Sequence, residues 1–297
     1  MRTLYRVAWV SALAGLIPLA GCSYFIPTKR HLPVPIAPPS VQTLTPEELV
    51  NHLNARWDAM NTLTLTAEIS ATQTKSAEGT ATDYPSCRGI ILMRKPKMLR
   101  VVLLCFDIRI LDMASDGSHF TLVMPTKNTV IKGSNSAPAK STVQWENLRP
   151  DFFLDALAVR GLEPDDSYMV GSETDTVPDA ANKHLYVEPE YTLSVMHHKQ
   201  GQEYLPVRQV TFHRDDMLPY EQYVYDQNGV LETQIFYSNY QNFTAGKYPS
   251  KITIKRPQEG IQLVLAVERV DENVPGGLPD SQFEEKIPAG ATIKEQN

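Results

Sequence analysis

In the stretch GIILMRKPKMLRVVL, residues 89–103, two apolar runs flank a basic turn that contains a proline. An antiparallel hairpin centred on Pro96 pairs Ile91 with Val101. In the same register Met93 faces Leu99, and the arginines of both runs fall on the opposite face. The separation of apolar from charged side chains predicts two half-buried strands that pack one face against a core.

The same register places Cys87 opposite Cys105. Directly opposed residues of neighbouring strands are close enough for a disulfide. An even pair of cysteines favours one in proteins that are exported. We therefore expect a Cys87–Cys105 disulfide, and two buried free thiols are the alternative.

Alternation with a period of two recurs along the chain and predicts an extensive sheet. From Leu63 to Ala71, apolar residues alternate with threonine, serine and glutamate, as in a strand with one wet face. Asn228-Gly229 is a strong hairpin signal. The acidic segment Pro164–Asp179 is expected to be a surface loop. The expected strands are 62–72, 89–93, 99–106, 106–113, 120–124, 183–187, 191–197, 207–213, 220–225, 230–237, 251–255 and 261–270.

Two helices are expected. Thr45-Pro46-Glu47-Glu48 is typical of a helix start, with Thr45 as N-cap and Glu48 completing a capping box. This helix runs to about Asn61 and carries apolar residues at helical spacing. A second helix is expected over 150–159, where Pro150 opens an apolar segment that ends before Gly161.

The apolar face of the strands and of the second helix is expected to line the interior. A long antiparallel sheet with one apolar face must curl around a core, around helices or around a ligand. The sequence therefore predicts a mainly β fold with α, and periodicity leaves open whether the interior is packed or hollow. The expected lining residues are Leu63, Leu65, Ile69, Ile91, Met93, Leu99, Val101, Leu103, Ile108, Ile110, Phe120, Leu122, Phe152, Phe153, Ile252, Ile254, Leu263 and Leu265.

The amino-terminal segment is typical of a secretory signal peptide. Basic residues precede an apolar run from Val7 to Ile17, which is too short to span a membrane. Leu19-Ala20-Gly21-Cys22 resembles the bacterial lipobox, which implies cleavage before Cys22 and its acylation. An ordinary signal peptide with a coincidental cysteine is the alternative. We expect a signal peptide over 1–21, a lipidated, proline-rich tether over 22–45, and one domain over 46–297; an arm packed on the domain is the alternative to the tether.

Charge and motifs exclude several classes of function. The formal net charge is −6, which argues against a nucleic-acid partner and against polybasic docking to a membrane. No nucleophile elbow, phosphate-binding loop or zinc-protease motif is present. His197 and His198 are adjacent on an expected strand and point to opposite faces, so they are poorly placed to bind one metal ion. No catalytic residue, metal site or cofactor is expected.

Six segments together resemble the LolA/LolB fold of periplasmic lipoprotein carriers and the wider lipoprotein-sorting-like superfamily. They are LTLTAEIS (63–70), GIILMRKPKMLRVVL (89–103) followed by LDMASDGSHFTLVMP (111–125), LRPDFFLDAL (148–157), and YDQNGVLETQIFYSNYQNFTAGKYPSKITIKRP (225–257) with LVLAVERVDENVPGGLPDSQFEEKIPAGA (263–291). The resemblance implies an open antiparallel half-barrel of about eleven strands, with helices on its concave side and a cavity for acyl chains. Lipid anchoring is similar to LolB, and Ser23 after the lipidated cysteine implies the outer membrane.

Two functional hypotheses follow from the resemblance. The first is a carrier or acceptor, anchored at the periplasmic face of the outer membrane, that binds lipid or the acyl chains of a lipoprotein. The second is a structural or adaptor lipoprotein with a packed interior that binds a periplasmic or outer-membrane protein. Neither hypothesis involves catalysis.

Overall fold

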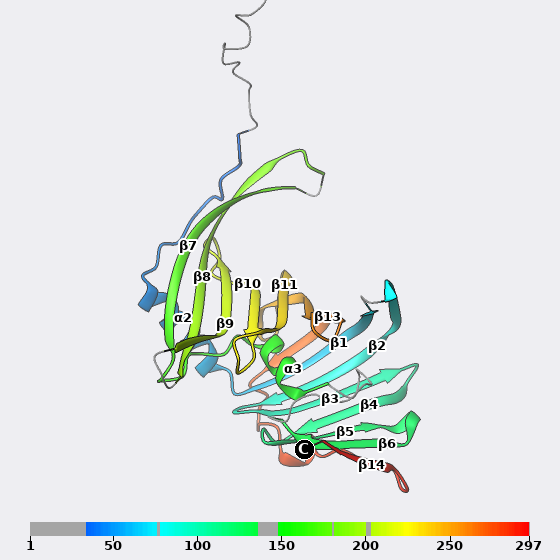
Figure 1. The fold of residues 1–297 in the computed structure, drawn as a ribbon. Helices are drawn as coiled ribbons and strands as arrows, with labels where there is room; N and C mark the ends of the chain where they lie inside the picture. Colours follow the sequence, from blue (N-terminus) through cyan, green and yellow to red (C-terminus); the bar gives the residue numbers. More distant parts are fainter. Residues whose placement is uncertain (1–33, 76–77, 136–147, 180, 200–202, 297) are drawn as a thin grey trace, which may run out of the picture. The chain divides into compact units, whose positions relative to one another are not determined.

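The structure of the protein is a computed structural model that describes residues 34–75, 78–135, 148–179, 181–199 and 203–296 (Figure 1). The expected signal peptide, Cys22 and the first part of the tether lie outside the described residues. Helix α2 spans Pro46–Ala59 and helix α3 spans Pro150–Leu157. The strands are β1 (Thr62–Lys75), β2 (Thr80–Arg94), β3 (Met98–Cys105), β4 (Ile108–Ser115), β5 (His119–Met124), β6 (Thr129–Ser134), β7 (Ser167–Pro178), β8 (Leu185–Lys199), β9 (Glu203–His213), β10 (Pro219–Tyr225), β11 (Leu231–Phe243), β12 (Gly246–Arg256), β13 (Ile261–Glu272) and β14 (Thr292–Gln296).

The strands form one open, 14-stranded sheet in the order β14-β6-β5-β4-β3-β2-β1-β13-β12-β11-β10-β9-β8-β7. The fold class predicted from the sequence is confirmed, but the predicted number of about eleven strands was too low. The sheet is also not antiparallel throughout, because β14 pairs with β6 in parallel. Within the described residues, no helix has the length and apolar character needed to cross a membrane.

Three strands were missed for identifiable reasons. The expected loop Pro164–Asp179 was wrong, since it contains β7, which ends the strand order and exposes most of its side chains. An edge strand of this kind needs no apolar alternation. In β6 the adjacent residues Val130 and Ile131 are both buried, so alternation is also lost there. The short strand β14 lies at the other end of the order and is mostly exposed.

The β2–β3 hairpin has the predicted register. Ile91 pairs with Val101, and Met93 pairs with Leu99. The row continues through Leu65 on one side and through Met113 and Leu122 on the other, which places apolar residues of neighbouring strands side by side. The five residues of the row through Ile91 and Val101, namely Leu65, Ile91, Val101, Met113 and Leu122, are at most 1% exposed. The middle of the sheet's inner face is therefore packed.

Helix α2 begins and packs as its sequence predicts. The Thr45 hydroxyl accepts a hydrogen bond from the backbone N–H of Glu48, whose side chain accepts one from the backbone N–H of Thr45. This capping box satisfies N–H groups that lack partners within the helix. Leu49 and Leu53 are buried against apolar residues of β8 and β9. The helix thus covers one part of the inner face.

The described chain divides into two compact units. One contains Thr176–Tyr186 and the described residues up to Ala37, where Ile36 forms a parallel bridge with Tyr186. The other contains Pro38–Asp175 and Val187–Asn297. In this larger unit, the backbone N–H groups of Gln42 and Leu44 donate to the Arg214 carbonyl and the Tyr191 hydroxyl. The last residues of the expected tether are therefore packed on the domain.

Candidate functional site

Helix α3 lies on the concave side of the curved sheet in the larger unit (Figure 1). Phe153 and Leu157 are buried in the main hydrophobic core together with residues of β1 to β5 and β11 to β13. The predicted helix is confirmed, although it ends at Leu157 and not near Val159. Its position makes α3 the element that fills the hollow of the sheet.

Side chains of three neighbouring strands hold the carboxyl end of α3. The Gln222 amide of β10 donates to the Asp155 carbonyl at 2.9 Å, and the Tyr237 hydroxyl of β11 donates to the same oxygen at 3.3 Å. The Tyr248 hydroxyl of β12 donates to the Leu157 carbonyl at 2.6 Å. Carbonyls in the last turn of a helix have no partner within the helix. These three side chains therefore supply the missing donors and attach α3 to the sheet.

An apolar pocket of about 300 Å³ adjoins Phe153 of α3 and Leu148, which precedes the helix, and we call it the Phe153 pocket. Its wall consists mainly of apolar side chains from β1 to β5, β13 and α3. Polar groups in the lining come from Thr126, Lys127 and the Tyr84 hydroxyl. The expected lining residues that surround this pocket are Ile69, Leu103, Ile110, Phe153 and Leu263.

The size of the Phe153 pocket limits what it can hold. An apolar cavity of about 150 Å³ holds benzene. A pocket of about 300 Å³ therefore suits a segment of one flexible acyl chain, and it is too small for a complete diacyl lipid while α3 is in place. The lining offers few hydrogen-bond donors, so it matches the chemistry of an alkyl chain.

A second pocket, of about 210 Å³, lies at the other end of α3, and we call it the Tyr248 pocket. Leu157 and Tyr248 line it together with residues of α2, and its wall also includes the charged residues Arg56 and Glu272. Burial raises the pKa of Glu272, an effect that nearby Arg56 partly offsets. Burial also raises the pKa of Tyr248, so its hydroxyl stays protonated and donates to α3.

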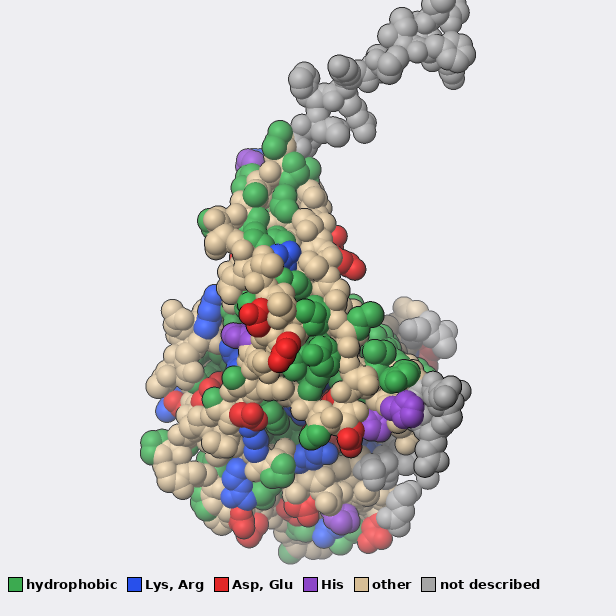
Figure 2. Space-filling model, turned by 90° about the vertical axis from the view of Figure 1, so that its left-hand side faces the viewer, with side chains coloured by type: hydrophobic (Ala, Val, Ile, Leu, Met, Phe, Trp, Pro, Cys, Tyr) green, Lys and Arg blue, Asp and Glu red, His purple; other side chains and the backbone are tan. Residues whose placement is uncertain are grey.

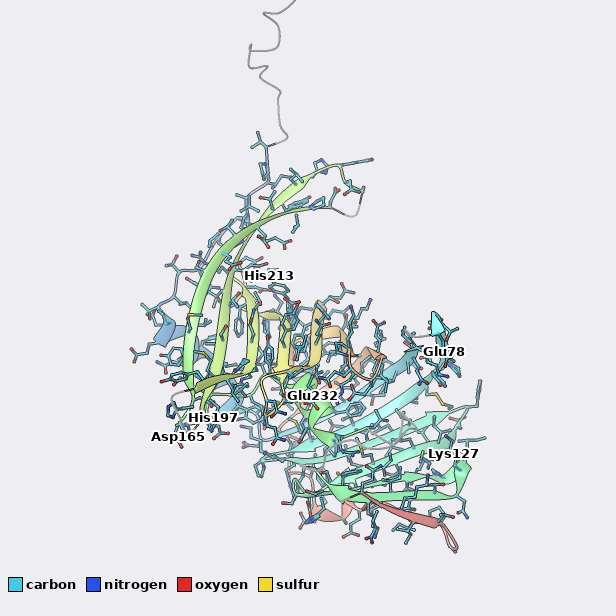
Figure 3. All side chains as sticks on the ribbon, viewed as in Figure 1. Glu78, Lys127, Asp165, His197, His213 and Glu232 are labelled. Atoms are coloured by element: carbon cyan, nitrogen blue, oxygen red, sulfur yellow. A yellow bond between two sulfur atoms is a disulfide. The ribbon has the colours of Figure 1, made fainter. Side chains whose placement is uncertain are left out.

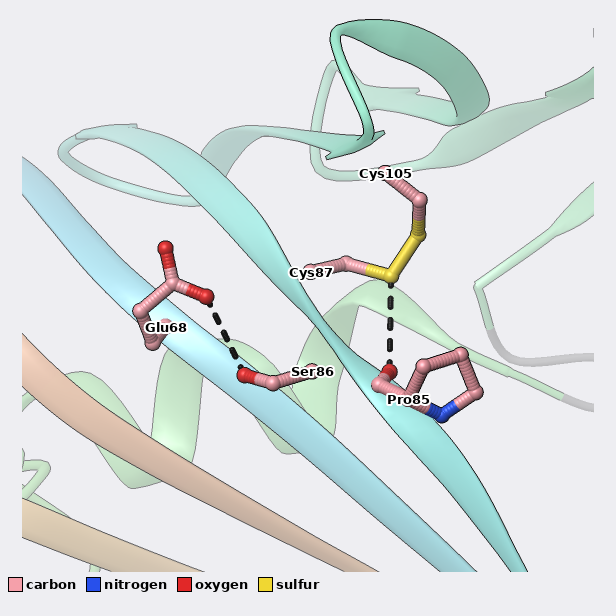
Figure 4. Close-up of a disulfide and its surroundings, with 5 residues drawn as sticks. All are labelled: Glu68, Pro85, Ser86, Cys87 and Cys105. Atoms are coloured by element: carbon pink, nitrogen blue, oxygen red, sulfur yellow. Dashed lines mark hydrogen bonds between the residues drawn. A yellow bond between two sulfur atoms is a disulfide. The ribbon is translucent and has the colours of Figure 1, made fainter.

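The Cys87 side chain forms part of the Phe153 pocket, and a disulfide links it to Cys105 across the β2–β3 hairpin (Figure 4). The two Cα atoms are 4.6 Å apart. The Cys87 sulfur lies 3.5 Å from the Pro85 carbonyl oxygen. The disulfide therefore fixes the end of the hairpin where β3 leaves the pocket wall.

The turn after Cys105 exposes the large apolar side chains of Phe106 and Ile108. The sequence did not predict that either of them is exposed. Phe106 and Asp107 have positive φ angles of 51° and 60°, a turn conformation in which glycine and asparagine are normally found. Phe106 is 90% exposed and Ile108 is 60% exposed. The prediction that Ile108 lines the interior was wrong, because the residue lies at the hairpin tip and beyond the packed rows. The sequence signal for the turn is Asp107, which lies between the apolar run 101–106 and the largely apolar segment 108–111.

The other expected lining residues occupy the packed core and border neither of these two pockets. The side chain of Phe152 and the expected lipidation site Cys22 lie outside the described residues. On the face drawn in Figure 2, acidic and basic side chains are interspersed, and neither sign forms a continuous patch. The buried residues that border neither pocket are Leu63, Leu65, Ile91, Met93, Leu99, Val101, Phe120, Leu122, Ile252, Ile254 and Leu265.

No protein-family model matches the sequence, and no curated protein matches it. A DUF1329 family protein from Desulfovibrio piger has a similar structure, with 15% sequence identity and a TM-score of 0.50 over 80% of this chain and 94% of that chain. A LolA superfamily protein from Nitrosomonas europaea matches at 14% identity over 82% of this chain and 99% of the other, with a TM-score of 0.49. A lipoprotein-sorting domain from Vibrio parahaemolyticus matches at 13% identity over 80% and 94%, also at 0.49.

These likenesses concern the fold alone. The fold assignment rests on the match at a TM-score of 0.50. A LolA superfamily protein and a lipoprotein-sorting domain are among the similar structures.

Proposed function

We propose that the protein is a lipid-binding lipoprotein of the bacterial envelope, which holds an acyl chain in the Phe153 pocket. The observation that carries this proposal is the pocket itself, an apolar space of about 300 Å³ between the inner face of the sheet and α3. Each buried methylene contributes about 0.8 kcal/mol. A segment of eight methylenes would then gain roughly 6 kcal/mol, close to what it loses on leaving a bilayer. Such a balance favours transfer of the chain between sites.

Movement of α3 would enlarge the binding space. Leu148 and Phe153 border the Phe153 pocket, while Leu157 and Ala158 border the Tyr248 pocket. The helix therefore lies between the two spaces. Its carboxyl end is held by hydrogen bonds that each contribute about 0.5–1.5 kcal/mol net. A ligand with more than one chain could displace α3 at a cost that its own burial would offset.

The exposed turn at Phe106 is suited to contact the source of the ligand. Phe106 is 90% exposed, and the strands that flank its turn contribute Leu103 and Ile110 to the pocket wall. An aromatic side chain held in an unfavourable backbone conformation at a surface often has a functional role. We place the delivery of acyl chains from a membrane or a lipoprotein at this turn.

Anchoring at the periplasmic face of the outer membrane belongs to the same proposal. It rests on the lipobox-like segment that ends at Cys22, on Ser23 after it, and on the expected tether. The proposed ligand is lipid or the acyl chains of a lipoprotein, with no cofactor and no nucleic acid. Mass spectrometry of the mature amino terminus tests the anchor, which requires an acylated Cys22.

A matched pair of variants tests the pocket. Leu103 and Leu104 are adjacent on β3 and both half-buried, but only Leu103 lines the Phe153 pocket. Leu103→Glu should abolish binding of a fluorescent fatty acid, because it places a carboxylate in the apolar wall. Leu104→Glu, on the other face of the strand, should bind as the wild type does. Equal binding of the fatty acid by both variants would show that the Phe153 pocket is not the binding site.

One observation favours a second function. The row through Leu65, Ile91 and Val101 is almost completely buried, so much of the inner face is packed. A packed interior suits an adaptor lipoprotein that binds a protein partner on its outer surface. Under this alternative, the purified protein binds no fatty acid, so the wild type, Leu103→Glu and Leu104→Glu all show no binding.

A further inference from the structure

A cluster of carboxylate and imidazole groups, none of which lines either pocket, lies where β8 and β9 pair in the larger unit. Glu188, Glu190 and His213 each present one ligand atom, and these atoms lie within 4.8 Å of one another. Glu190 and His213 are direct cross-strand partners. Glu188 precedes Glu190 by two positions, so both point to the same face of the strand. The backbone N–H of Arg214 donates to the Pro189 carbonyl at 2.9 Å, which fixes the spacing of the strands at this point.

The donor set suits a metal ion and is not simply an acidic surface. It combines one imidazole nitrogen with two carboxylate oxygens, which are ligands that Zn²⁺ accepts. Two donors bound to one Zn²⁺ at ~2.1 Å are at most ~4.2 Å apart. Donor atoms already within 4.8 Å need only small side-chain rotations to reach that geometry.

The burial of Glu190 gives a second, independent reason for a cation. Glu190 is only 7% exposed; the Tyr220 hydroxyl and the nearby His213 stabilise its charge, whereas the carboxylates of Asp175 and Glu188 repel it. Among the described residues, no lysine or arginine forms a salt bridge with Glu190. A buried carboxylate that has like-charged neighbours and no lysine or arginine partner is costly. A divalent ion held between Glu188, Glu190 and His213 would remove this cost.

Tyr220 orients two of the three groups. Its ring stacks on that of His213, with 4.0 Å between centroids and 15° between planes. Its hydroxyl lies beside the Glu190 carboxylate and interacts with it. Metal sites commonly use such neighbouring groups to fix the orientation of their ligands.

We propose that Glu188, Glu190 and His213 bind a divalent transition-metal ion, with Zn²⁺ as the best match. The three protein ligands leave a coordination position for water or another small ligand. The ion would join β8 to β9 close to Tyr191 and Arg214, which hold the segment before α2. Sequence reasoning missed the cluster because Glu190 and His213 are far apart in the chain, and only the strand register brings them together.

Zinc titration of the full chain tests the proposal. The protein is purified in detergent, stripped with a chelator and titrated with Zn²⁺ by calorimetry. We expect one saturable site per chain, and at least about tenfold weaker binding for Glu190→Gln and for His213→Gln. The control is His197→Gln, since His197 lies at the other end of the β8–β9 pair (Figure 3) and should leave binding unchanged.

Two further measurements separate loss of a ligand from loss of fold. Melting without metal should show that each variant is folded, and Zn²⁺ should raise the melting temperature of the wild type but not of His213→Gln. If His213→Gln does not fold, the half-buried Glu188 is replaced by glutamine and tested in the same way. Absence of saturable binding in the wild type, or undiminished affinity in the folded ligand variants, would overturn the proposal.

Discussion

The hydroxyl of Tyr248 on β12 donates a hydrogen bond of 2.6 Å to the main-chain carbonyl of Leu157, the last residue of α3. Both residues are buried and both line the Tyr248 pocket. A side chain of the sheet thus supplies the donor that the end of the helix lacks. The contact ties the position of α3 to the shape of the space beside it.

Removal of this hydroxyl should loosen α3. Tyr248→Phe keeps the ring but leaves the Leu157 carbonyl buried without that donor. We expect the free energy of unfolding to fall by about 1–3 kcal/mol, measured by urea denaturation. We also expect faster amide exchange in α3. Tyr223→Phe is the control, because its hydroxyl contacts the Glu221 side chain of its own strand; the same loss in both variants would argue against a specific role for Tyr248.

The packed row through the middle of the sheet predicts a sharp difference between neighbouring valines. Val101 is completely buried, whereas Val102 on the other face is half-buried. Val101→Thr should destabilise the protein by about 1–3 kcal/mol, because it buries a hydroxyl in an apolar row. Val102→Thr should change stability by less than about 0.5 kcal/mol. Similar small effects at both positions, measured by thermal melting, would indicate that water reaches the row.

The disulfide is expected to stabilise the β2–β3 hairpin. Peptide mapping without reductant should recover Cys87 and Cys105 in one cross-linked species. Replacement of both by serine should lower stability by about 3 kcal/mol in the chain-entropy model. Two alkylatable thiols in protein isolated under oxidising conditions would contradict the pairing.

The raised pKa of Glu272 predicts a pH dependence of stability. Because burial raises the pKa of this carboxyl in the folded state, the folded protein binds the proton more tightly, and stability falls as the pH rises above the ordinary glutamate range. Glu272→Gln should therefore raise the melting temperature at pH 8. The gain should vanish below about pH 4, where the carboxyl is protonated in both states. Glu268→Gln, on the exposed face of the same strand, should have no effect; a gain for Glu272→Gln that persists at low pH would point to another cause.

Sequence reasoning succeeded where local chemistry was decisive. The proline turn fixed the pairing of Ile91 with Val101, and the Thr45–Glu48 pair marked the start of α2. It failed at β6, β7 and β14, because strands that are buried on both faces or exposed on both faces carry no alternation.

The candidate site was only partly predictable for a related reason. The identity of inward-facing residues such as Leu103 follows from strand periodicity. Whether each one packs against α3 or borders a pocket depends on the position of the helix, and strand periodicity does not predict that position. The exposure of Phe106 and the meeting of Glu190 with His213 depend on a turn and on a strand register that lie outside the predicted hairpin.

The identity of any molecule bound to the purified protein tests the proposed function. The chain without residues 1–22, exported by another signal peptide and purified without detergent, has no covalent lipid, so any acyl species extracted by solvent was bound non-covalently. The proposed function predicts lipid or fatty acid at about one molecule per protein by quantitative mass spectrometry, with loss in Leu103→Glu and retention in Leu104→Glu. A folded protein that contains no acyl species and takes none up from vesicles would contradict it.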